Sequence, residues 1–355
     1  MGSIRGHDRL PDDKSPNCPA KFFYACLNPK VMKEIRRKGL LKHKGRENAV
    51  FWSEKDFLDG PISAGVIILP TIGCRWGRRE GCTMCGYVYD AAKNATQENI
   101  FNEFKKSIDK IGDVKYLKIF TSGSFLDPQE ISLSSMKKIL TNIPEHVRRV
   151  QIESRPEFIS ENVLIDIKGL MKAEFEIGIG LESANDRIRE SINKGFTFDD
   201  FKKAARLCVK QDIKVKAYLL LKPPFLTEKE AISDVKNSIA EAANAGAERA
   251  SVNPINVQKS TLVEMLWRRG EYRPPYLWSV VEILKWADEN ADIPVISHPT
   301  AAGKMRGAHN CKSCDREVYR GILAYSITQE PEHLEMDCKC KSVWKNLLEL
   351  EQLKH

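Results

Sequence analysis

The chain has 355 residues, of which 42% are hydrophobic and 29% are charged, which is ordinary for a soluble globular protein with one large domain and appendages. No apolar run approaches the length that crosses a membrane, which argues against an integral membrane protein. The net charge of +8 is a mild excess that does not by itself identify a nucleic-acid-binding protein.

Residues 1–60 are predicted to form a basic N-terminal extension. Residues 30–47 hold eight Lys or Arg side chains and only two acidic ones, and the N-terminus has no hydrophobic signal region. We therefore expect the chain in the reducing cytoplasm, where its ten cysteines favour metal sites over disulfides. Cys18, Cys26 and Cys208 stand apart from the other cysteines and are expected to be packed or free thiols.

Strand-like and helix-like segments alternate over residues 61–295. Short apolar strands, each followed by a helical pattern, predict a parallel sheet with right-handed crossovers. Six such units are two short of a complete barrel, so we expect an α/β fold with a partial (β/α)6 TIM-type barrel. A doubly wound sheet is the alternative. In chain order, the expected elements are strand 64–69, helix 97–111, strand 115–121, helix 129–142, strand 147–153, helix 161–171, strand 175–181, helices 186–192 and 198–210, strand 215–221, helix 228–245, strand 250–253 and a helix near 277–290.

Three cysteines follow the first expected strand, in the segment GCRWGRREGCTMCGY. Cys74, Cys82 and Cys85 are one thiolate short of the four that close a [4Fe–4S] cluster. A cluster held by three cysteines leaves one iron open for an exogenous ligand, such as the amino and carboxylate groups of S-adenosylmethionine (SAM). The alternatives are a zinc knuckle completed by a remote side chain such as His309, or three buried thiols.

Small and polar residues stand at the C-terminal ends of the other expected strands. Each of these segments alone is as typical of an ordinary turn as of a binding site. Because the C-terminal ends of barrel strands meet on one face, the segments together predict a site there. They are TSGSFLD at 121–127, ESRP at 153–156, GIGLES at 178–183, KPP at 222–224, and Asn253 with Pro254.

Residues 296–355 are predicted to form a small metal-binding region. Cys311 and Cys314, followed by Cys338 and Cys340, supply two close pairs of thiolates, the usual arrangement of a closed tetrahedral zinc site. We expect a structural zinc ion; a second iron–sulfur cluster and a tail without metal are the alternatives. A metal would stabilise a tail that is too small to build its own core.

A second basic segment, LWRRGEYRPPYLW at 266–278, interleaves arginines with aromatic residues. Arg268, Arg269, Tyr272 and Arg273 suit contact with RNA phosphates and stacking on bases. The alternative is a solvated helix end followed by aromatic residues of the core.

Together these motifs resemble the radical SAM superfamily. The triple-cysteine loop is followed in order by TSGSFLD, ESRP and GIGLESAND, and the long first cysteine spacing resembles the Elongator catalytic-subunit type. More narrowly, SGSFLD, KPPFLTE, SVNPINVQ and the cysteine-rich tail are similar to the archaeosine synthase radical-subunit (RaSEA) family. The resemblance extends from about residue 51 to residue 344.

The resemblance implies which residues hold the cofactors. Cys74, Cys82 and Cys85 would ligate the cluster and so form the catalytic centre. The superfamily usually has an aromatic residue before the last cysteine; here Met84 stands there, so adenine would pack on Met84 or Tyr87. Gly123 and Ser124 would lie near the methionine amino group of SAM, Glu153 and Glu182 would bond its polar groups, and Arg155 or Lys222 would pair with its carboxylate. The cofactor-binding residues expected at this face are Tyr87, Gly123, Ser124, Glu153, Arg155, Glu182, Lys222 and Asn253.

The resemblance also implies a reaction and partners. The substrate would be a tRNA whose D-arm carries a 7-cyano-7-deazaguanine base, to which a partner subunit adds lysine through its ε-amino group. The radical subunit would act as a lyase: a 5′-deoxyadenosyl radical takes hydrogen from the lysyl carbon beside the amidine nitrogen, and cleavage of that C–N bond leaves archaeosine. The implied partners are tRNA, the lysine-transferring subunit and an electron-donor protein, with no membrane.

Two other functions stay open at this stage. One is a radical SAM enzyme that acts on another RNA or on a small molecule. The other is a non-catalytic iron–sulfur or RNA-binding subunit that never cleaves SAM. Formation of 5′-deoxyadenosine separates the enzymes from the subunit, and mass spectrometry of tRNA nucleosides separates the two enzymes.

Overall fold

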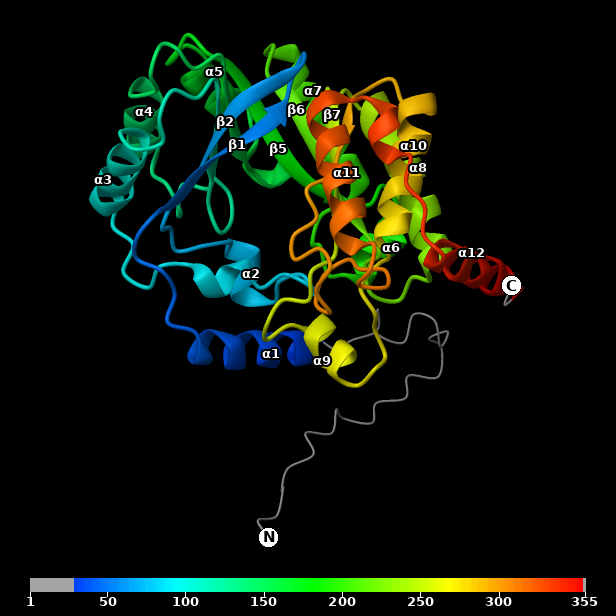
Figure 1. Cartoon of the computed structure of the whole chain (residues 1–355). Helices are drawn as coiled ribbons and strands as arrows, with labels where there is room; N and C mark the ends of the chain where they lie inside the picture. Colours follow the sequence, from blue (N-terminus) through cyan, green and yellow to red (C-terminus); the bar gives the residue numbers. More distant parts are fainter. Residues whose placement is uncertain (1–28, 354–355) are drawn as a thin grey trace.

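A curved sheet of eight strands forms the frame of the fold (Figure 1). The computed structural model describes residues 29–353, so the expectations for Cys18 and Cys26 lie outside the described residues. The strands lie side by side in chain order; β1 is antiparallel to β2, and every other neighbouring pair is parallel. The strands are β1 (Val50–Phe57), β2 (Pro61–Ile68), β3 (Tyr116–Phe120), β4 (Arg149–Glu153), β5 (Glu174–Glu182), β6 (Lys214–Leu221), β7 (Arg249–Pro254) and β8 (Val295–Ile296).

Helices connect the parallel strands and cover the outer face of the sheet (Figure 1). Polar side chains start several of them: Thr197 and Thr227 each form a capping box with the acidic residue three positions later. No helix of the described part of the chain is long and apolar enough to cross a membrane. The helices are α1 (Pro29–Lys42), α2 (Arg75–Arg79), α3 (Gln97–Ile108), α4 (Leu133–Thr141), α5 (Glu161–Lys168), α6 (Asp186–Ser191), α7 (Phe198–Lys210), α8 (Glu228–Asn244), α9 (Leu262–Arg268), α10 (Leu277–Asn290), α11 (Asp315–Thr328) and α12 (Cys340–Gln352), with single 3-10 turns at Tyr87–Asp90, Pro156–Phe158 and Pro331–Leu334.

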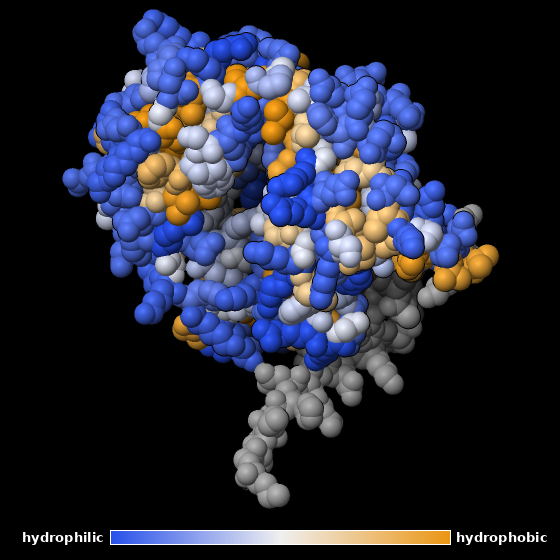
Figure 2. Space-filling model, in the orientation of Figure 1, coloured by the Kyte–Doolittle hydropathy of each residue, from blue (hydrophilic) through white to orange (hydrophobic). Residues whose placement is uncertain are grey.

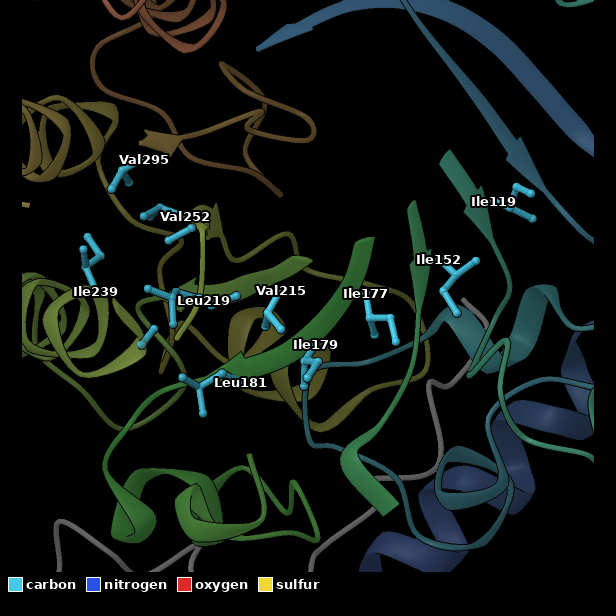
Figure 3. Close-up of a cluster of buried hydrophobic side chains, with 14 of the residues drawn as sticks. Ile119, Ile152, Ile177, Ile179, Leu181, Val215, Leu219, Ile239, Val252 and Val295 are labelled. Carbon is cyan, nitrogen blue, oxygen red and sulfur yellow. The ribbon is translucent and has the colours of Figure 1, made fainter. Parts of the chain in front are cut away.

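The main hydrophobic core lies between the sheet and these helices. Alternate strand residues, such as Ile177 and Ile179 of β5 and Val215 and Leu219 of β6, are buried against the helical layer. Figure 3 shows them in one cluster with Ile239 of α8. Burial of an aliphatic side chain of this size contributes about 1.5–3 kcal/mol, so this layer fixes the order and register of the strands.

The inner face of the curved sheet is polar. Lys118, Glu176, Lys216 and Arg249 occupy the strand positions between the apolar ones, and each is at most 5% exposed. Most of this charge is paired; for example, an Arg249 Nη lies 2.8 Å from a Glu176 carboxylate oxygen. The inside of the barrel is therefore a buried layer of charges below the strand ends.

The partial α/β barrel predicted from the sequence is confirmed. The six expected parallel strands are β2–β7, and the expected helices correspond to α3–α8 and α10 within a few residues. The strand order has no switch point, so the doubly wound alternative is wrong. The sequence does not predict β1 or β8; β1 lies within the segment assigned to the N-terminal extension and adds an antiparallel edge to the sheet.

Helix α11 covers the gap between the first and the last strand. It packs against β1 and β2 on one side and against β8 on the other, although it follows β1 by more than 250 residues. Figure 1 shows α11 beside β1, and α1 with the short helices α2 and α9 together below the sheet. The barrel is thus closed by segments from both ends of the chain.

Candidate active site

A cavity of about 360 Å³ lies where the parallel strands end. Its walls come from the segments after β2, β3, β4, β5 and β7, from β6, and from residues 298 and 300 after β8. The space-filling view is hollowed near its centre (Figure 2). Of the residues that the sequence predicts for the site, the cavity is lined by Cys74, Cys82, Cys85, Tyr87, Gly123, Glu153, Arg155, Glu182 and Asn253.

Cys74 begins α2 directly after β2. Its backbone N–H donates to the carbonyl oxygen of Ser122 (3.2 Å), which ties it to the end of β3. Its Sγ accepts from the backbone N–H of Gly77 (3.2 Å). A backbone N–H aimed at sulfur favours the thiolate, the form that binds metals.

Arg36 of α1 holds the other two cysteines from outside the motif. Its guanidinium donates to the carbonyl oxygens of Cys85 (3.0 Å) and Cys82 (3.4 Å) and lies 4.9 Å from the centre of the Tyr89 ring. The side chain is only 3% exposed, and a Cβ on Gly81 would collide with it. The cysteine loop therefore depends on a helix that the sequence shows only as a basic run.

Residues after β7 hold the same loop from the other side. The backbone N–H of Gly86 donates to the Gln258 side chain, and the Tyr89 hydroxyl donates to the carbonyl oxygen of Ser260 (2.7 Å). His43, directly after α1, stacks on the Tyr89 ring at 4.8 Å and lies 3.2 Å from the Ser260 hydroxyl. The loop is thus clamped between α1 and the β7–α9 connection.

Gly123 allows the loop after β3 to touch the cysteine loop. A Cβ at this position would collide with a Glu130 carboxylate oxygen and would lie 2.5 Å from the Cα of Cys74. Glu130 accepts hydrogen bonds from the Ser124 N–H and the Thr71 hydroxyl, both at 2.7 Å. Burial raises the pKa of Glu130 to about 7. A residue without a side chain is required where these two loops meet.

The three cysteines fit a multi-iron cluster better than a single ion. Within residues 29–353, the group of potential ligand atoms that gathers within 4.8 Å is at the C-terminus, so Cys74, Cys82 and Cys85 are spread too widely to surround one ion. Burial raises the pKa of Cys74 and raises that of Cys85 to about 12. Such thiols become thiolates only when a bound metal takes up their charge, which fits a cluster at this wall of the cavity.

Glu182 lies at the irregularity that ends β5, with a φ of 66°. Its carboxylate is 2.7 Å from the Nζ of Lys194, and a Cβ on Gly180 would lie 2.9 Å from the same nitrogen. Burial opposes the charged form of Lys194, but the Glu182 carboxylate outweighs it and raises the Lys194 pKa. A fixed pair of opposite charges therefore faces the cavity.

Glu153 ends β4 beside Tyr218 of β6. Burial raises the pKa of Glu153 to about 7, and a hydrogen bond from Tyr218 opposes this shift only in part. The Tyr218 hydroxyl also accepts from Gln151 Nε2 (2.5 Å), and a Cβ on Gly178 would lie 2.6 Å from the Tyr218 ring. The Glu153 carboxyl can therefore hold or release a proton near neutral pH.

Two predicted cofactor residues do not line the cavity. Ser124 is buried, and its hydroxyl accepts from the backbone N–H of Arg155 (3.1 Å). Lys222 pairs with the buried carboxylate of Glu228 at 2.7 Å, which directs its ammonium away from the cavity. Arg155 does reach the cavity, but its guanidinium also donates to the carbonyl oxygen of Lys194 (3.0 Å). Of the two basic residues expected at the SAM carboxylate, only Arg155 is in reach.

The predicted RNA-binding patch is not formed as a unit. Tyr272 is 8% exposed and donates its hydroxyl to the carbonyl oxygen of Lys222 (2.8 Å). Arg273 donates to two backbone carbonyls and stacks on a tyrosine ring. Only Arg268 and Arg269 are exposed. The aromatic residues of this segment pack in the core, which is the alternative to an RNA-binding patch given in the sequence analysis.

The cavity also contains polar side chains that no motif marks. Lys194 comes from the connection between α6 and α7, and His298 follows the two-residue strand β8. Neither stands at the end of a strand that the sequence predicts. The polar side chains that line the cavity without having been predicted for it include Lys194, Tyr218, Asn256, Gln258, His298 and Thr300.

The C-terminal cysteines form a separate, compact group. The Sγ atoms of Cys311 and Cys314 are 3.6 Å apart, those of Cys311 and Cys338 3.7 Å, and those of Cys314 and Cys340 3.6 Å. A tetrahedral zinc site with bonds of about 2.3 Å separates its sulfur atoms by about 3.8 Å. The Trp278 indole N–H donates to the Cys340 sulfur at 3.2 Å, which stabilises a thiolate. This group could bind one metal ion.

Comparison with known proteins agrees with this arrangement. The model of the radical SAM superfamily matches residues 68–236, from the end of β2 into α8. The archaeosine synthase subunit beta of Methanosarcina acetivorans is 44% identical over 336 residues, which cover 92% of this chain and 96% of that protein. The archaeosine synthase subunit beta of Thermococcus kodakarensis is 40% identical over 312 residues, or 84% of this chain and 96% of that protein.

Among solved structures, a radical SAM methyltransferase from Sphaerobacter thermophilus is 12% identical, with a TM-score of 0.49 over 71% of this chain and 73% of its own. The two curated relatives are each matched over 96% of their own length. The chain belongs to the radical SAM superfamily and, within it, to the archaeosine synthase subunit beta family.

Proposed function

We propose that the protein is a radical SAM enzyme that carries out the last chemical step of archaeosine formation in tRNA. The observation that carries this proposal is the convergence of three cysteines and the polar ends of five strands on one cavity. The names of the two similar relatives support the choice of archaeosine over other products. A [4Fe–4S] cluster with one open iron would bind SAM there and supply the electron that cleaves it to a 5′-deoxyadenosyl radical.

Different residues of the cavity would bind different parts of SAM. Cys74, Cys82 and Cys85 would hold the cluster, and Gly123 would let the backbone approach the cofactor. The charged pair of Glu182 and Lys194 offers an acceptor for an amino group and a donor for a carboxylate. Lys194, with Arg155 beside it, would thus bind the SAM carboxylate, the role that the sequence analysis gives to Arg155 or Lys222. Tyr87, 57% exposed at the cavity wall, is suited to packing on adenine.

The substrate would be the lysine adduct of a 7-deazaguanine base in the D-arm of tRNA. The enzyme would cleave the lysine C–N bond next to the amidine, as a lyase, with the lysine-transferring subunit and an electron-donor protein as partners. Exposing a base of the folded tRNA costs a few kcal/mol of stacking and pairing, which contacts with the partner and with basic surface residues would offset. The cavity walls would keep water and other C–H bonds away from the reacting carbon.

The test uses the anaerobically reconstituted full chain with reductant, SAM and tRNA that carries the lysine adduct. We expect 5′-deoxyadenosine, and archaeosine among the tRNA nucleosides by mass spectrometry. Cys82→Ala should abolish both products, whereas Cys208→Ala, which removes a buried thiol behind the sheet, should retain them. Full turnover by Cys82→Ala would contradict the proposal. Deoxyadenosine without archaeosine would favour another substrate.

We also propose that Cys311, Cys314, Cys338 and Cys340 bind structural zinc rather than a second cubane. Sulfur separations of 3.6–3.7 Å match four ligands around one ion. A cubane spreads its thiolates over four irons and needs wider spacing. Four protein thiolates leave no open position, which supports a structural role.

A further inference from the structure

Lys216 of β6 lies inside the barrel below the cavity. It precedes Tyr218 and Leu220 by two and four residues, so the three side chains leave the same face of the strand, and the latter two line the cavity. Val215 and Leu219, which alternate with these residues along the strand, belong to the outer core instead (Figure 3). Lys216 is 3% exposed, so its ammonium is held in the polar interior.

The ammonium of Lys216 is left without a partner of opposite charge. Among residues 29–353, no hydrogen bond or ion pair joins it to another side chain; its Nζ lies 5.3 Å from the centre of the Tyr218 ring, and the charges of Asp56 and Glu176 act on it without a direct ion pair. The carboxyl groups near it are engaged elsewhere: Asp56 pairs with Lys118, Glu176 pairs with Arg249 at 2.8 Å, and Glu153 accepts a hydrogen bond from Tyr218. Burial and the charge of Arg249 lower the pKa of Lys216 to about 7.

His298 approaches the same place from the other side of the barrel. It follows β8 and lines the cavity, and its Nε2 is buried without a hydrogen-bond partner in the described part of the chain. Lys216 is one of the charges that act on its ring, which places the two side chains in one electrostatic environment with Asp56, Lys118 and Glu54. Burial lowers the pKa of His298 to about 4, so its imidazole is neutral at physiological pH and one ring nitrogen carries a proton to donate.

His298 at the cavity wall and Lys216 in the layer beneath it are two nitrogen groups without a direct partner among the described residues, and together they favour a ligand with acceptor oxygens. Buried donors in folded proteins are nearly always satisfied, by the protein or by what it binds. A carboxylate has two oxygens that can take one donor each, and its negative charge would pair with the Lys216 ammonium. A carboxylate on a slim aliphatic chain fits a cavity of about 360 Å³ better than a nucleic-acid backbone does.

We propose that Lys216 and His298 bind the carboxylate of an amino-acid group carried by the substrate. This inference rests on the proposed function, in which the substrate carries a lysine whose α-carboxylate lies at the far end of its side chain from the amidine. Binding at that end would position the carbon next to the amidine nitrogen at the SAM side of the cavity. Lys216 and His298 are therefore positioning residues for the substrate. The carboxylate of SAM itself is the other source of the same chemistry.

The first measurement uses two small probes and the reconstituted full chain. N6-(1-iminoethyl)-L-lysine is an amidine of lysine, and N-(5-aminopentyl)acetamidine is the same molecule without the carboxylate. By calorimetry or ligand-observed NMR, the wild type should bind the first at least tenfold more tightly. Lys216→Met and His298→Ala should reduce this ratio to about two or less. Lys214→Met is the matched control: it changes a lysine of the same strand that pairs with Glu248, and should keep the ratio.

Each remaining outcome decides for or against the site. A wild-type ratio near one overturns the inference. If Lys216→Met binds S-adenosylhomocysteine more weakly but keeps the probe ratio, Lys216 and His298 bind the carboxylate of the cofactor. That result would also overturn the inference. Lys216→Met removes an unpaired buried charge, so its thermal midpoint should not fall, and misfolding cannot account for lost binding.

A last measurement separates this inference from the proposed function. If the wild type makes archaeosine and Lys216→Met does so with an unchanged KM for the modified tRNA, the inference fails and the function stands. If the wild type makes no archaeosine but the probe ratio is tenfold and depends on Lys216, the carboxylate site stands and the enzyme acts on another substrate that bears an amino acid.

Discussion

Arg36 shows how one buried side chain can hold the triple-cysteine loop, the proposed cluster site, without touching its sulfur atoms. It donates to the carbonyl oxygens of Cys82 and Cys85 but binds neither sulfur. Hydrogen bonds from a charged donor contribute about 1.5–3 kcal/mol, and these bonds lie in a site where water cannot replace them. The shape of the loop therefore depends on α1 as well as on the cysteines.

We predict that Arg36→Gln lowers the free energy of unfolding by about 2 kcal/mol and reduces the iron content after reconstitution. Arg37→Gln is the control, because Arg37 lies on the exposed side of α1 and, within residues 29–353, pairs only with Glu34 of the same helix. That variant should change stability by less than about 0.5 kcal/mol. Denaturant unfolding and iron analysis measure both effects. Equal iron content in the two variants would contradict the role of Arg36.

At Gly123 the absence of a side chain is itself the functional feature. We predict that Gly123→Ala destabilises the protein by at least about 2 kcal/mol and lowers its iron content, because the new methyl group meets the buried Glu130 carboxylate and the Cys74 backbone. Gly169→Ala adds the same methyl group where no atom lies within 4 Å and should be close to neutral. Thermal unfolding and iron analysis compare the two. Normal iron binding by Gly123→Ala would show that the loops can move apart.

At the scale of elements, α8 is joined to the end of β5 through a buried carboxyl group. Asp234 of α8 accepts from the Ser183 hydroxyl (2.7 Å), and its other oxygen has no hydrogen-bond partner among the described residues. Burial raises the pKa of Asp234 to about 6, from an ordinary value near 4. The folded state therefore holds this proton more tightly than the unfolded state between about pH 4 and pH 6.

This shift predicts the sign of a pH dependence. The stability that Asp234 contributes is fully present below about pH 4 and is lost as the pH rises through 6, because ionisation then exposes the cost of a buried charge. Asp234→Asn should match the wild type at pH 4 and exceed it by about 1–3 kcal/mol at pH 7. Asp59→Asn, which changes an aspartate whose side chain is 83% exposed, should keep the wild-type profile. Denaturant unfolding at both pH values tests this; a variant that is weaker at pH 7 would contradict it.

The elements with regular periodicity could be predicted from the sequence, and those without it could not. The strands β2–β7 are short apolar runs between helical patterns, so their type and order follow from local pattern. β1 has no such signal: Trp52, Glu54 and Asp56 form one face of it and point into a polar barrel instead of an apolar core. The two residues of β8 are too few to show any period.

Site residues could likewise be predicted only where they stand in a regular sequence pattern. Glu153 and Glu182 stand at strand ends, where a barrel places its chemistry, and both line the cavity. Lys194 comes from a connection between two helices, so only the folded chain brings it to Glu182. A signal for Lys216 was present, since charged residues at alternate positions of an otherwise apolar strand indicate a polar inner face.

At the scale of the whole molecule, the C-terminal cysteines fasten the last helix to the outside of the barrel. The Trp344 indole of α12 donates to the Ser279 hydroxyl of α10 (2.9 Å), and the Glu351 carboxylate of α12 accepts from the first N–H groups of α8, including that of Lys229 at 2.9 Å. Figure 1 shows α12 at the side of the molecule away from α2, which follows Cys74. The two cysteine groups therefore belong to different parts of the fold.

This separation predicts that the two metal sites are lost independently. The double variant Cys338→Ser, Cys340→Ser should lose one zinc per chain and have a lower thermal midpoint, because α12 then has only its packing and the contacts of Trp344 and Glu351 to hold it against α8 and α10. Its iron content after reconstitution should stay at the wild-type level, because distant sites without shared partners behave additively. Cys82→Ala should show the reverse, with iron lost and zinc retained. Metal analysis of both variants by mass spectrometry tests this prediction. Iron in the C-terminal site would contradict the zinc assignment. Loss of both metals from either variant would contradict the independence of the two sites.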